Sequence, residues 1–305
     1  MYASRTQLTA AGPEISRFIA GYWRVNQWQL SDQALLNFIN QTLELGISTV
    51  DHAMVYRSEA PFGRALALQP ALRDQLQIIT KFGIRPKGFG ELGARQINHY
   101  DSSSTAIVES VDASLRDLQT DYIDVLLIHR PDYLMNAHEV VAAFESLKNS
   151  GKVRYFGVSN FNNDQFTWLQ AVLQKSLGIE LVTNQIEFSP LHLDPLDDGT
   201  FEHCQLLGYQ PMLWSCLAGG RLINENTERQ RNIITALRTV AEEWQQEHIE
   251  TIVYAWCMAL PCAPAPLLGT QNLERVKIAL SAEDISLNRE QWYRIWEASA
   301  GHPVP

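Results

Sequence analysis

Residues 123–131 read IDVLLIHRP, and this stretch decides the fold. Residues 125–128 are four consecutive apolar side chains, and the run ends at His129. A continuous apolar run of this kind is typical of a strand that helices cover on both faces, as in parallel sheets. We therefore expect a parallel sheet between helices, with His129 at the end of one of its strands.

Seven more runs of this kind alternate with helical patterns from one end of the chain to the other. Eight such alternations favour a (β/α)8 TIM barrel over a doubly wound sheet. No linker-like stretch or break in composition divides the chain, so we expect one barrel domain over residues 1–305. The eight runs are residues 15–24, 48–53, 76–83, 123–131, 153–160, 181–189, 210–217 and 265–270.

The helical patterns have a period near 3.6 residues and begin and end at suitable residues. Ser31 precedes one helix as an N-cap, and Gly46 and Gly151 stand where helices should end. The clearest patterns are residues 32–46, 103–120, 138–151 and 229–248.

Two stretches lie outside this alternation. Residues 288–301 predict an extra C-terminal helix, whose Trp292, Tyr293 and Trp296 we assign to packing. Residues 84–101 are irregular, and a loop of that length inside a compact domain is usually functional or mobile.

Composition excludes several classes of protein. With 46% hydrophobic and 19% charged side chains, the chain is not disordered as a whole. The net charge of −10 argues against a nucleic-acid partner, because such proteins usually carry a basic excess. The first residues lack the apolar core of a secretory signal, and no run approaches the ~20 apolar residues that span a bilayer. We expect a cytoplasmic chain without a membrane partner.

The four cysteines are Cys204, Cys216, Cys257 and Cys262. They form no CxxC pair and have no spacing typical of Cys and His metal ligands. We therefore expect reduced cysteines and no metal site.

The residues at the strand ends predict the chemistry, because barrel active sites form at the carboxyl ends of the strands. Asp51, Lys81 and His129 stand at three such ends, and Tyr56 follows Asp51 by five residues. A lone His or a lone Lys–Asp pair is usually structural, but the four residues together are coherent. A Lys held by an Asp can lower the pKa of a nearby Tyr from its ordinary value near ~10. The sequence therefore predicts proton transfer by Tyr56.

A phosphate-binding end is also indicated, although no GxGxxG follows an early strand and a classical dinucleotide fold is unsupported. Thr270 and Asn272 precede LERV as a helix start, which is a natural phosphate site. Arg275 lies one turn inside this helix, where its guanidinium either binds a phosphate through two N–H groups or is a solvated charge on the helix surface. Residues 219–221 read GGR, which either lets a phosphate approach the backbone or is only a turn.

Six segments in order resemble the aldo-keto reductase superfamily over nearly the whole chain: TVDHAMVY, ITKFG, LLIHRPD, GKVRYFGVSNF, TNQIEFSP and LLGTQNLERV. ISRFIAGYWR and MLWSCLAGGRL are most similar to a bacterial branch of poorly characterised oxidoreductases within it. The resemblance implies a barrel that binds NADPH without a Rossmann fold and reduces the carbonyl group of a small molecule. It also implies a monomer.

The resemblance further implies a role for each matched residue. The catalytic residues are Asp51, Tyr56, Lys81 and His129. Cofactor binding is implied for Asp51 and for Gly21, Tyr22 and Trp23 at the end of the first strand. At the nicotinamide, the carboxamide is implied to be bound by Ser159, Asn160 and Gln185, and the ring to stack on Trp214. The pyrophosphate is implied to lie along Ser215, Leu217 and Gly219, and the adenosine 2′-phosphate among Gly269, Thr270, Gln271 and Arg275. Gly269 stands where many members of the family use a Lys.

Three readings of the function remain open at this point. The first is an NADPH-dependent carbonyl reductase in which Tyr56 is the general acid. The second is a nicotinamide-binding regulatory or sensor protein with slow turnover. An unrelated barrel hydrolase or isomerase ranks last, because no GxSxG or metal-ligand cluster is present.

The substrate does not follow from the sequence. Four aromatic residues could build a pocket for apolar aldehydes or ketones, or could simply pack in the core. They are Trp23, Phe89, Tyr100 and Trp214.

Overall fold

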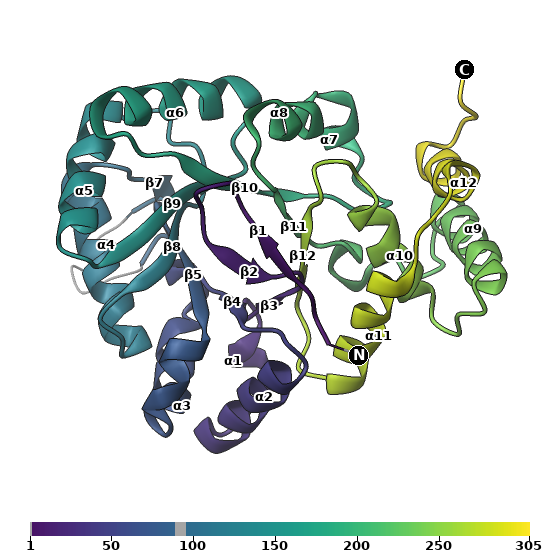
Figure 1. The fold of residues 1–305 in the computed structure, drawn as a ribbon, viewed down its shortest axis with the longest axis horizontal. Coiled ribbons are helices and arrows are strands. Elements are labelled where there is room, and N and C mark those ends of the chain that lie inside the picture. The colour runs from purple at the N-terminus through teal and green to yellow at the C-terminus, as the bar shows by residue number, and fades with distance from the viewer. Residues whose placement is uncertain (1, 89–95) are drawn as a thin grey trace.

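The computed structural model describes residues 2–88 and 96–305. Its centre is a closed barrel of eight parallel strands, with helices around the outside (Figure 1). Each barrel strand lies within one of the eight predicted runs, so the predicted (β/α)8 barrel is confirmed. In ring order the strands are β3 (Ile19–Gly21), β4 (Thr49–Asp51), β5 (Gln77–Phe82), β8 (Ile123–Ile128), β9 (Val153–Ser159), β10 (Leu181–Glu187), β11 (Met212–Trp214) and β12 (Ala265–Leu268).

The helices follow the predicted patterns closely. Ser31 and Ser103 accept hydrogen bonds from the backbone at the starts of two of them, as N-caps do. The helix predicted to reach residue 248 ends at Glu243, because Gln245 takes a left-handed φ of 53°. The helices are α1 (Val25–Trp28), α2 (Asp32–Glu44), α3 (Glu59–Ala67), α4 (Ser104–Leu118), α5 (Ala137–Asn149), α6 (Asn163–Leu177), α7 (Asp194–Asp197), α8 (Thr200–Leu207), α9 (Glu228–Glu243), α10 (Ile249–Met258), α11 (Leu273–Leu280) and α12 (Arg289–Ala300).

Strand β8 shows how the core is divided. Val125 and Leu127 belong to a small apolar cluster inside the barrel. Leu126 and Ile128 belong to the larger cluster between the strands and the helices. Successive side chains of a strand point to opposite faces, so a strand buried on both faces is apolar throughout. This explains the continuous run from which the fold was predicted.

The first predicted run, residues 15–24, is not one strand. Its first part belongs to β2 (Glu14–Ser16), which pairs antiparallel with β1 (Arg5–Gln7), and the barrel strand β3 starts only at Ile19. The chain turns between the two strands, where the Ser16 hydroxyl donates to the backbone oxygen of Phe18 at 2.6 Å. In Figure 1 this hairpin lies across the near end of the barrel. Ile15 of β2 and Leu8, which follows β1, join the inner cluster and close that end.

Part of the predicted irregular stretch 84–101 is a short antiparallel pair, β6 (Ile84–Arg85) with β7 (His99–Tyr100). Phe89, one of the four aromatic pocket candidates, lies outside the described residues.

The predicted extra helix is α12, and its aromatic residues pack as expected with one exception. Trp292 stacks on Trp256 of α10 with ring centroids 5.2 Å apart, and each indole N–H donates to the other residue's backbone oxygen at 3.1 Å. Trp296 also packs against the core. Tyr293 remains 42% exposed, so it contributes less.

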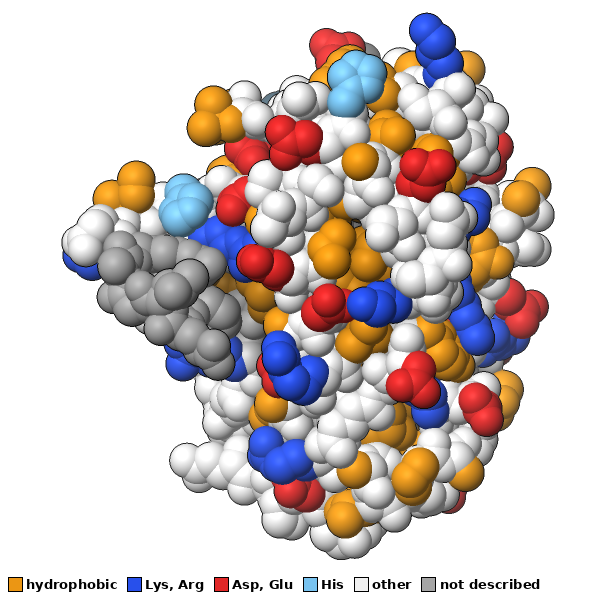
Figure 2. Space-filling view, turned by 90° about the vertical axis from the view of Figure 1, so that its left-hand side faces the viewer, with side chains coloured by type: hydrophobic (Ala, Val, Ile, Leu, Met, Phe, Trp, Pro, Cys, Tyr) orange, Lys and Arg blue, Asp and Glu red, His pale blue; other side chains and the backbone are white. Residues whose placement is uncertain are grey.

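On the side of α4 and α5, Lys and Arg side chains are mixed with Asp and Glu (Figure 2). None of the helices in the described ranges is both long and apolar enough to cross a bilayer. Within the same residues, no group of three His, Cys, Asp or Glu side chains is arranged to hold a metal ion. The four cysteines are free and buried.

Candidate active site

The barrel brings the four predicted catalytic residues to one edge. Asp51 ends β4 and pairs in register with Ile79 of β5, so that Lys81 lies close to it at the same end. The Lys81 ammonium donates to both carboxylate oxygens of Asp51, at 2.6 and 2.8 Å. It also donates to the backbone oxygen of His52 at 2.8 Å. Both side chains are buried, so this ion pair is fixed beneath the barrel mouth.

Tyr56 lies above this pair, in the 3-10 turn Met54–Tyr56 that follows β4. The Lys81 Nζ is 5.2 Å from the centre of its ring. Its hydroxyl shares a hydrogen bond of 3.2 Å with Nε2 of His129, the residue that follows β8. The phenol is therefore fixed between an imidazole and an ion pair.

A residue that the sequence analysis missed holds this turn. The Asn26 amide donates to the backbone oxygens of Tyr56 and Arg57, at 3.1 and 3.2 Å. Arg57 has a left-handed φ of 55°, so the chain reverses direction directly after the phenol. Asn26 thus ties α1 to the segment that positions Tyr56.

Burial controls the protonation of the site. It raises the pKa of Tyr56, and Asp51 raises it further, while the charge of Arg130 lowers it. Burial lowers the pKa of His129 well below its ordinary range, and the charges of Lys81 and Arg130 act in the same direction. Burial also lowers the pKa of Lys81, but Asp51 opposes that shift. At neutral pH the phenol is therefore protonated and the imidazole is neutral.

The residues predicted for the nicotinamide end form one hydrogen-bonded group beside this site. Ser159 donates to the backbone oxygen of Gln185 at 2.8 Å, and the Gln185 amide donates to Asp51 at 2.8 Å. The Asn160 amide donates to the Ser159 hydroxyl at 2.8 Å. Trp214 donates from its indole to Asn160 at 3.2 Å. The group is therefore linked directly to Asp51.

The residues predicted for the phosphates lie at the ends of β11 and β12. Gly219 and Gly220 have left-handed φ values of 66° and 92°, and a Cβ on Gly220 would meet no atom within 4 Å. Ser215 and Leu217 are half-buried in the same loop. A pyrophosphate would meet exposed backbone at Gly219 and Gly220, while the N–H groups of Ala218, Gly220 and Arg221 donate within the turn.

The second phosphate end surrounds the start of α11. Asn272 caps this helix by accepting from the backbone N–H groups of Glu274 and Arg275, at 2.9 and 3.3 Å. Thr270 in turn accepts from the backbone of Asn272 at 3.0 Å. A positive helix end beside an Arg fits a phosphate. Exposed at this end are Gly269, Gln271 and Arg275.

The three residues after β3 take different positions. Gly21 ends the strand and pairs in register with Asp51. Trp23 is 58% exposed and its ring centroid is 6.3 Å from that of Tyr56, so it borders the mouth. Tyr22 has a fully buried side chain that stacks on His52, and only its backbone is available near the mouth. Tyr100 of β7 is 39% exposed and is therefore not part of the core.

Comparison with known proteins agrees with this geometry. The model of the aldo/keto reductase family matches residues 17–300. The chain belongs to the aldo/keto reductase family.

Individual relatives match the chain over nearly its full length. Oxidoreductase YdhF of Escherichia coli is 46% identical over 304 residues, which cover 99% of each chain. The uncharacterized oxidoreductase YcsN of Bacillus subtilis is 43% identical and covers 96% of this chain and 97% of its own. A 6-dehydroglucose reductase of Agrobacterium fabrum is 37% identical, with 95% and 96% covered. The predicted family and its bacterial branch are thus confirmed, and the chain is an oxidoreductase.

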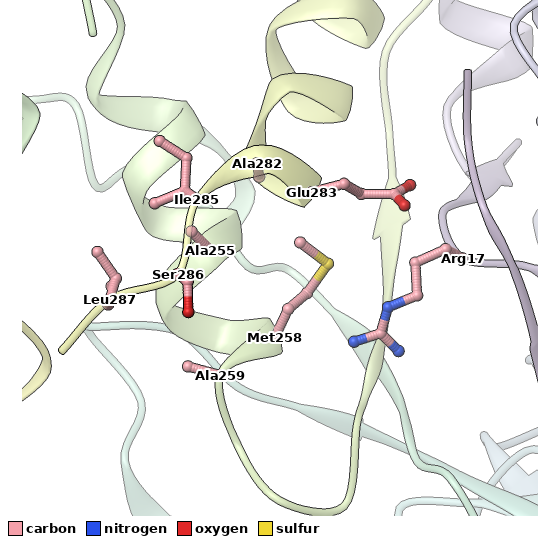
Figure 3. Close-up of a pocket in the computed structure, with 9 residues that line it drawn as sticks. All are labelled: Arg17, Ala255, Met258, Ala259, Ala282, Glu283, Ile285, Ser286 and Leu287. Atoms are coloured by element: carbon pink, nitrogen blue, oxygen red, sulfur yellow. The ribbon is translucent and has the colours of Figure 1, made fainter. Parts of the chain in front are cut away.

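A cavity of about 320 Å³ lies away from this site of the reductase (Figure 3). Arg17 and Glu283 stand on one side of it. Arg17 precedes β3 and donates to the backbone oxygen of Ala263 at 2.6 Å, and Glu283 accepts from the backbone of Ser4 at 3.1 Å. None of the predicted site residues lines this cavity. Its polar side chains therefore serve to join segments at the amino ends of the strands.

Glu59 is a second residue that the sequence analysis missed. It begins α3, is only 2% exposed, and accepts a hydrogen bond of 2.5 Å from the hydroxyl of Thr80, the neighbour of Lys81. Burial raises the pKa of this carboxyl to about 7, although hydrogen bonds and the charge of Lys81 oppose the shift. The reductase therefore has a buried acid behind Lys81 that titrates near neutral pH.

Glu59→Gln should make the stability of the reductase less sensitive to pH. The folded chain keeps a proton that the unfolded chain loses above a pKa of 4.5, so this group costs stability as pH rises from about 4.5 through about 7. The free energy of unfolding of the variant, relative to that of wild type, should therefore rise by on the order of 3 kcal/mol from about pH 5 to about pH 8. Urea unfolding at the two pH values measures this difference. The exposed Glu242→Gln is the control, and an equal difference at both pH values for Glu59→Gln would refute the assignment.

Proposed function

We propose that this oxidoreductase reduces aldehyde or ketone carbonyls to alcohols with NADPH, and that Tyr56 is the general acid. One observation carries the proposal: the Tyr56 hydroxyl lies 3.2 Å from Nε2 of His129 at the mouth of the barrel, above a buried Lys–Asp pair. This arrangement suits proton delivery to an oxygen that enters the mouth.

Four residues of the chain take part in proton transfer, each with a different role. Tyr56 begins protonated, as a general acid must, because burial raises its pKa. As it gives its proton to the carbonyl oxygen, negative charge develops on the phenol. The Lys81 ammonium, 5.2 Å from the ring centre, stabilises that charge, and Asp51 keeps the ammonium in place. His129 holds the phenol through the hydrogen bond of 3.2 Å, and its imidazole would orient the carbonyl oxygen that enters beside it.

NADPH, when bound, supplies the hydride, which is chemistry that protein side chains lack. Ser159, Asn160 and Gln185 would hold its carboxamide beside Asp51, and Trp214 would lie against the nicotinamide. The exposed backbone at Gly219 would follow the pyrophosphate.

NADPH should bind more tightly than NADH, because Arg275 lies in the first turn of α11, where a 2′-phosphate would meet a positive helix end. Arg275→Met should weaken NADPH binding by about tenfold and NADH binding far less. Quenching of Trp214 fluorescence gives both affinities. Lys277→Met is the matched control, since it removes a cation of the same helix that is paired with Glu274. Equal affinity of the wild type for the two cofactors would contradict the preference.

The proposed activity is tested by NADPH oxidation with a panel of aldehydes, ketones and quinones. We expect turnover with several aldehydes. Tight NADPH binding with negligible turnover across the panel would instead favour a regulatory or sensor role.

A further inference from the structure

Arg130 is a charged residue of the mouth for which neither the cofactor nor the proton transfer provides a role. It follows His129 directly, and its side chain is half-buried. Its guanidinium carbon lies 6.0 Å from the centre of the Trp214 ring. Its charge also acts on both Tyr56 and His129, whose pKa values it lowers. The guanidinium therefore lies beside the residues that would meet the carbonyl group.

Within residues 2–88 and 96–305, no carboxylate forms an ion pair with Arg130. The nearest acid in the sequence, Asp132, is already occupied, because its two oxygens accept from the backbone of Leu134 and Ser102 at 2.9 Å each. In contrast, the structural arginines Arg73 and Arg154 are both paired with an aspartate. A half-buried guanidinium that is not paired with an anion at the mouth is available to an anionic ligand.

The cofactor phosphates do not account for this cation. The residues expected at the 2′-phosphate follow β12, which lies opposite β8 in the ring of strands. The loop expected at the pyrophosphate follows β11 but lies beside the segment after β3, because Arg24 donates to the backbone oxygen of Gly219 at 3.3 Å. An anion that faced Arg130 would therefore belong to the other reactant.

The geometry points to a substrate class: this site takes aldehydes or ketones that carry a carboxylate, which Arg130 binds while the carbonyl oxygen meets Tyr56 and His129. The inference rests on the proposed carbonyl reduction and narrows its substrates. A guanidinium suits this role because its fork of N–H groups matches the two oxygens of a carboxylate.

The test compares para- and meta-carboxybenzaldehyde with their methyl esters, which keep the ring and the aldehyde but lack the charge. Arg130→Met should lower kcat/KM for at least one of the acids by about 10- to 100-fold, mainly through KM. The loss with the matching ester should be clearly smaller. Arg130→Lys should restore part of the lost activity with the acid. Arg116→Met removes the same charge on the exposed side of α4, far from the mouth, and should leave kcat/KM unchanged for both the acids and the esters.

Two results overturn the inference and are distinguishable from failure of the proposed function. Equal losses with acid and ester would show that Arg130 acts only through the charge that it places near Tyr56. The other result is a wild type with a higher kcat/KM for both esters than for the acids, together with an Arg130→Met variant whose kcat/KM for the acids is unchanged. It would show that no carboxylate is bound. Failure of the wild type with all four aldehydes would overturn the carbonyl reductase proposal itself.

Discussion

Tyr56→Phe is expected to lower kcat on a good aldehyde by about 10²- to 10⁴-fold, the usual contribution of general acid catalysis. The change removes one hydroxyl, whose hydrogen-bond partner is His129, and leaves the ring in place. Folding and NADPH binding should therefore persist. Steady-state NADPH oxidation measures the first effect, and fluorescence titration with thermal unfolding measures the other two.

Tyr122→Phe is the matched control for this prediction. Tyr122 packs between Arg73 and Arg154, just before β8 and thus at the opposite end of the barrel. Its loss of a hydroxyl should leave turnover unchanged. Near-normal kcat in Tyr56→Phe would mean that the proton comes from His129 or from water.

Lys81→Met should be nearly as damaging as the loss of the phenol, and Asp51→Asn should be milder. Lys81→Met removes the cation that stabilises the developing phenolate, whereas Asp51→Asn leaves that cation bonded to the backbone oxygen of His52. Lys81→Met also leaves a buried carboxylate with Gln185 as its remaining side-chain donor, so stability should fall by about 3–5 kcal/mol. Turnover and the melting temperature are measured for both variants.

The alternative is that Lys81 and Asp51 are only a stabilising ion pair. The pH–rate profile of a folded Lys81→Met variant distinguishes the two accounts, at a temperature well below its melting point. Our account requires low activity and a shifted ionisation. Unchanged turnover and pH dependence, with only a lower melting temperature, would support the alternative. If Lys81→Met fails to fold, the same profile of Asp51→Asn serves instead, because loosening the ammonium should also shift it.

The barrel was predictable because its strands are buried on both faces. Runs such as residues 125–128 cannot alternate in polarity, and the polar residue after each run falls at the carboxyl edge. The convergence of Asp51, Lys81 and His129 follows from that rule alone. The hairpin before β3 was missed because the apolar pattern continues through the turn at Phe18, which is itself buried. Periodicity does not distinguish a strand that enters a barrel from one that closes its end.

The missed residues of the site depend on packing between distant segments. Glu59 lies in the sequence RSEA, which looks solvent-exposed, and only the approach of α3 to β5 buries it against Thr80. Asn26 acts through a contact with residues thirty positions away along the chain. Arg130 is adjacent to His129 and could have been considered from its place at the strand end. Its lack of an acidic partner among the described residues becomes visible only in three dimensions.

The central claim is tested most directly by following deuterium into the product of an aldehyde reaction from NADPH in which both hydrogens at C4 of the nicotinamide are deuterium. The account predicts that wild-type enzyme forms an alcohol with deuterium on the former carbonyl carbon. It also predicts that Tyr56→Phe forms the same labelled alcohol at a rate about 10²- to 10⁴-fold lower. An alcohol without deuterium, or equal rates for the two proteins, would contradict it.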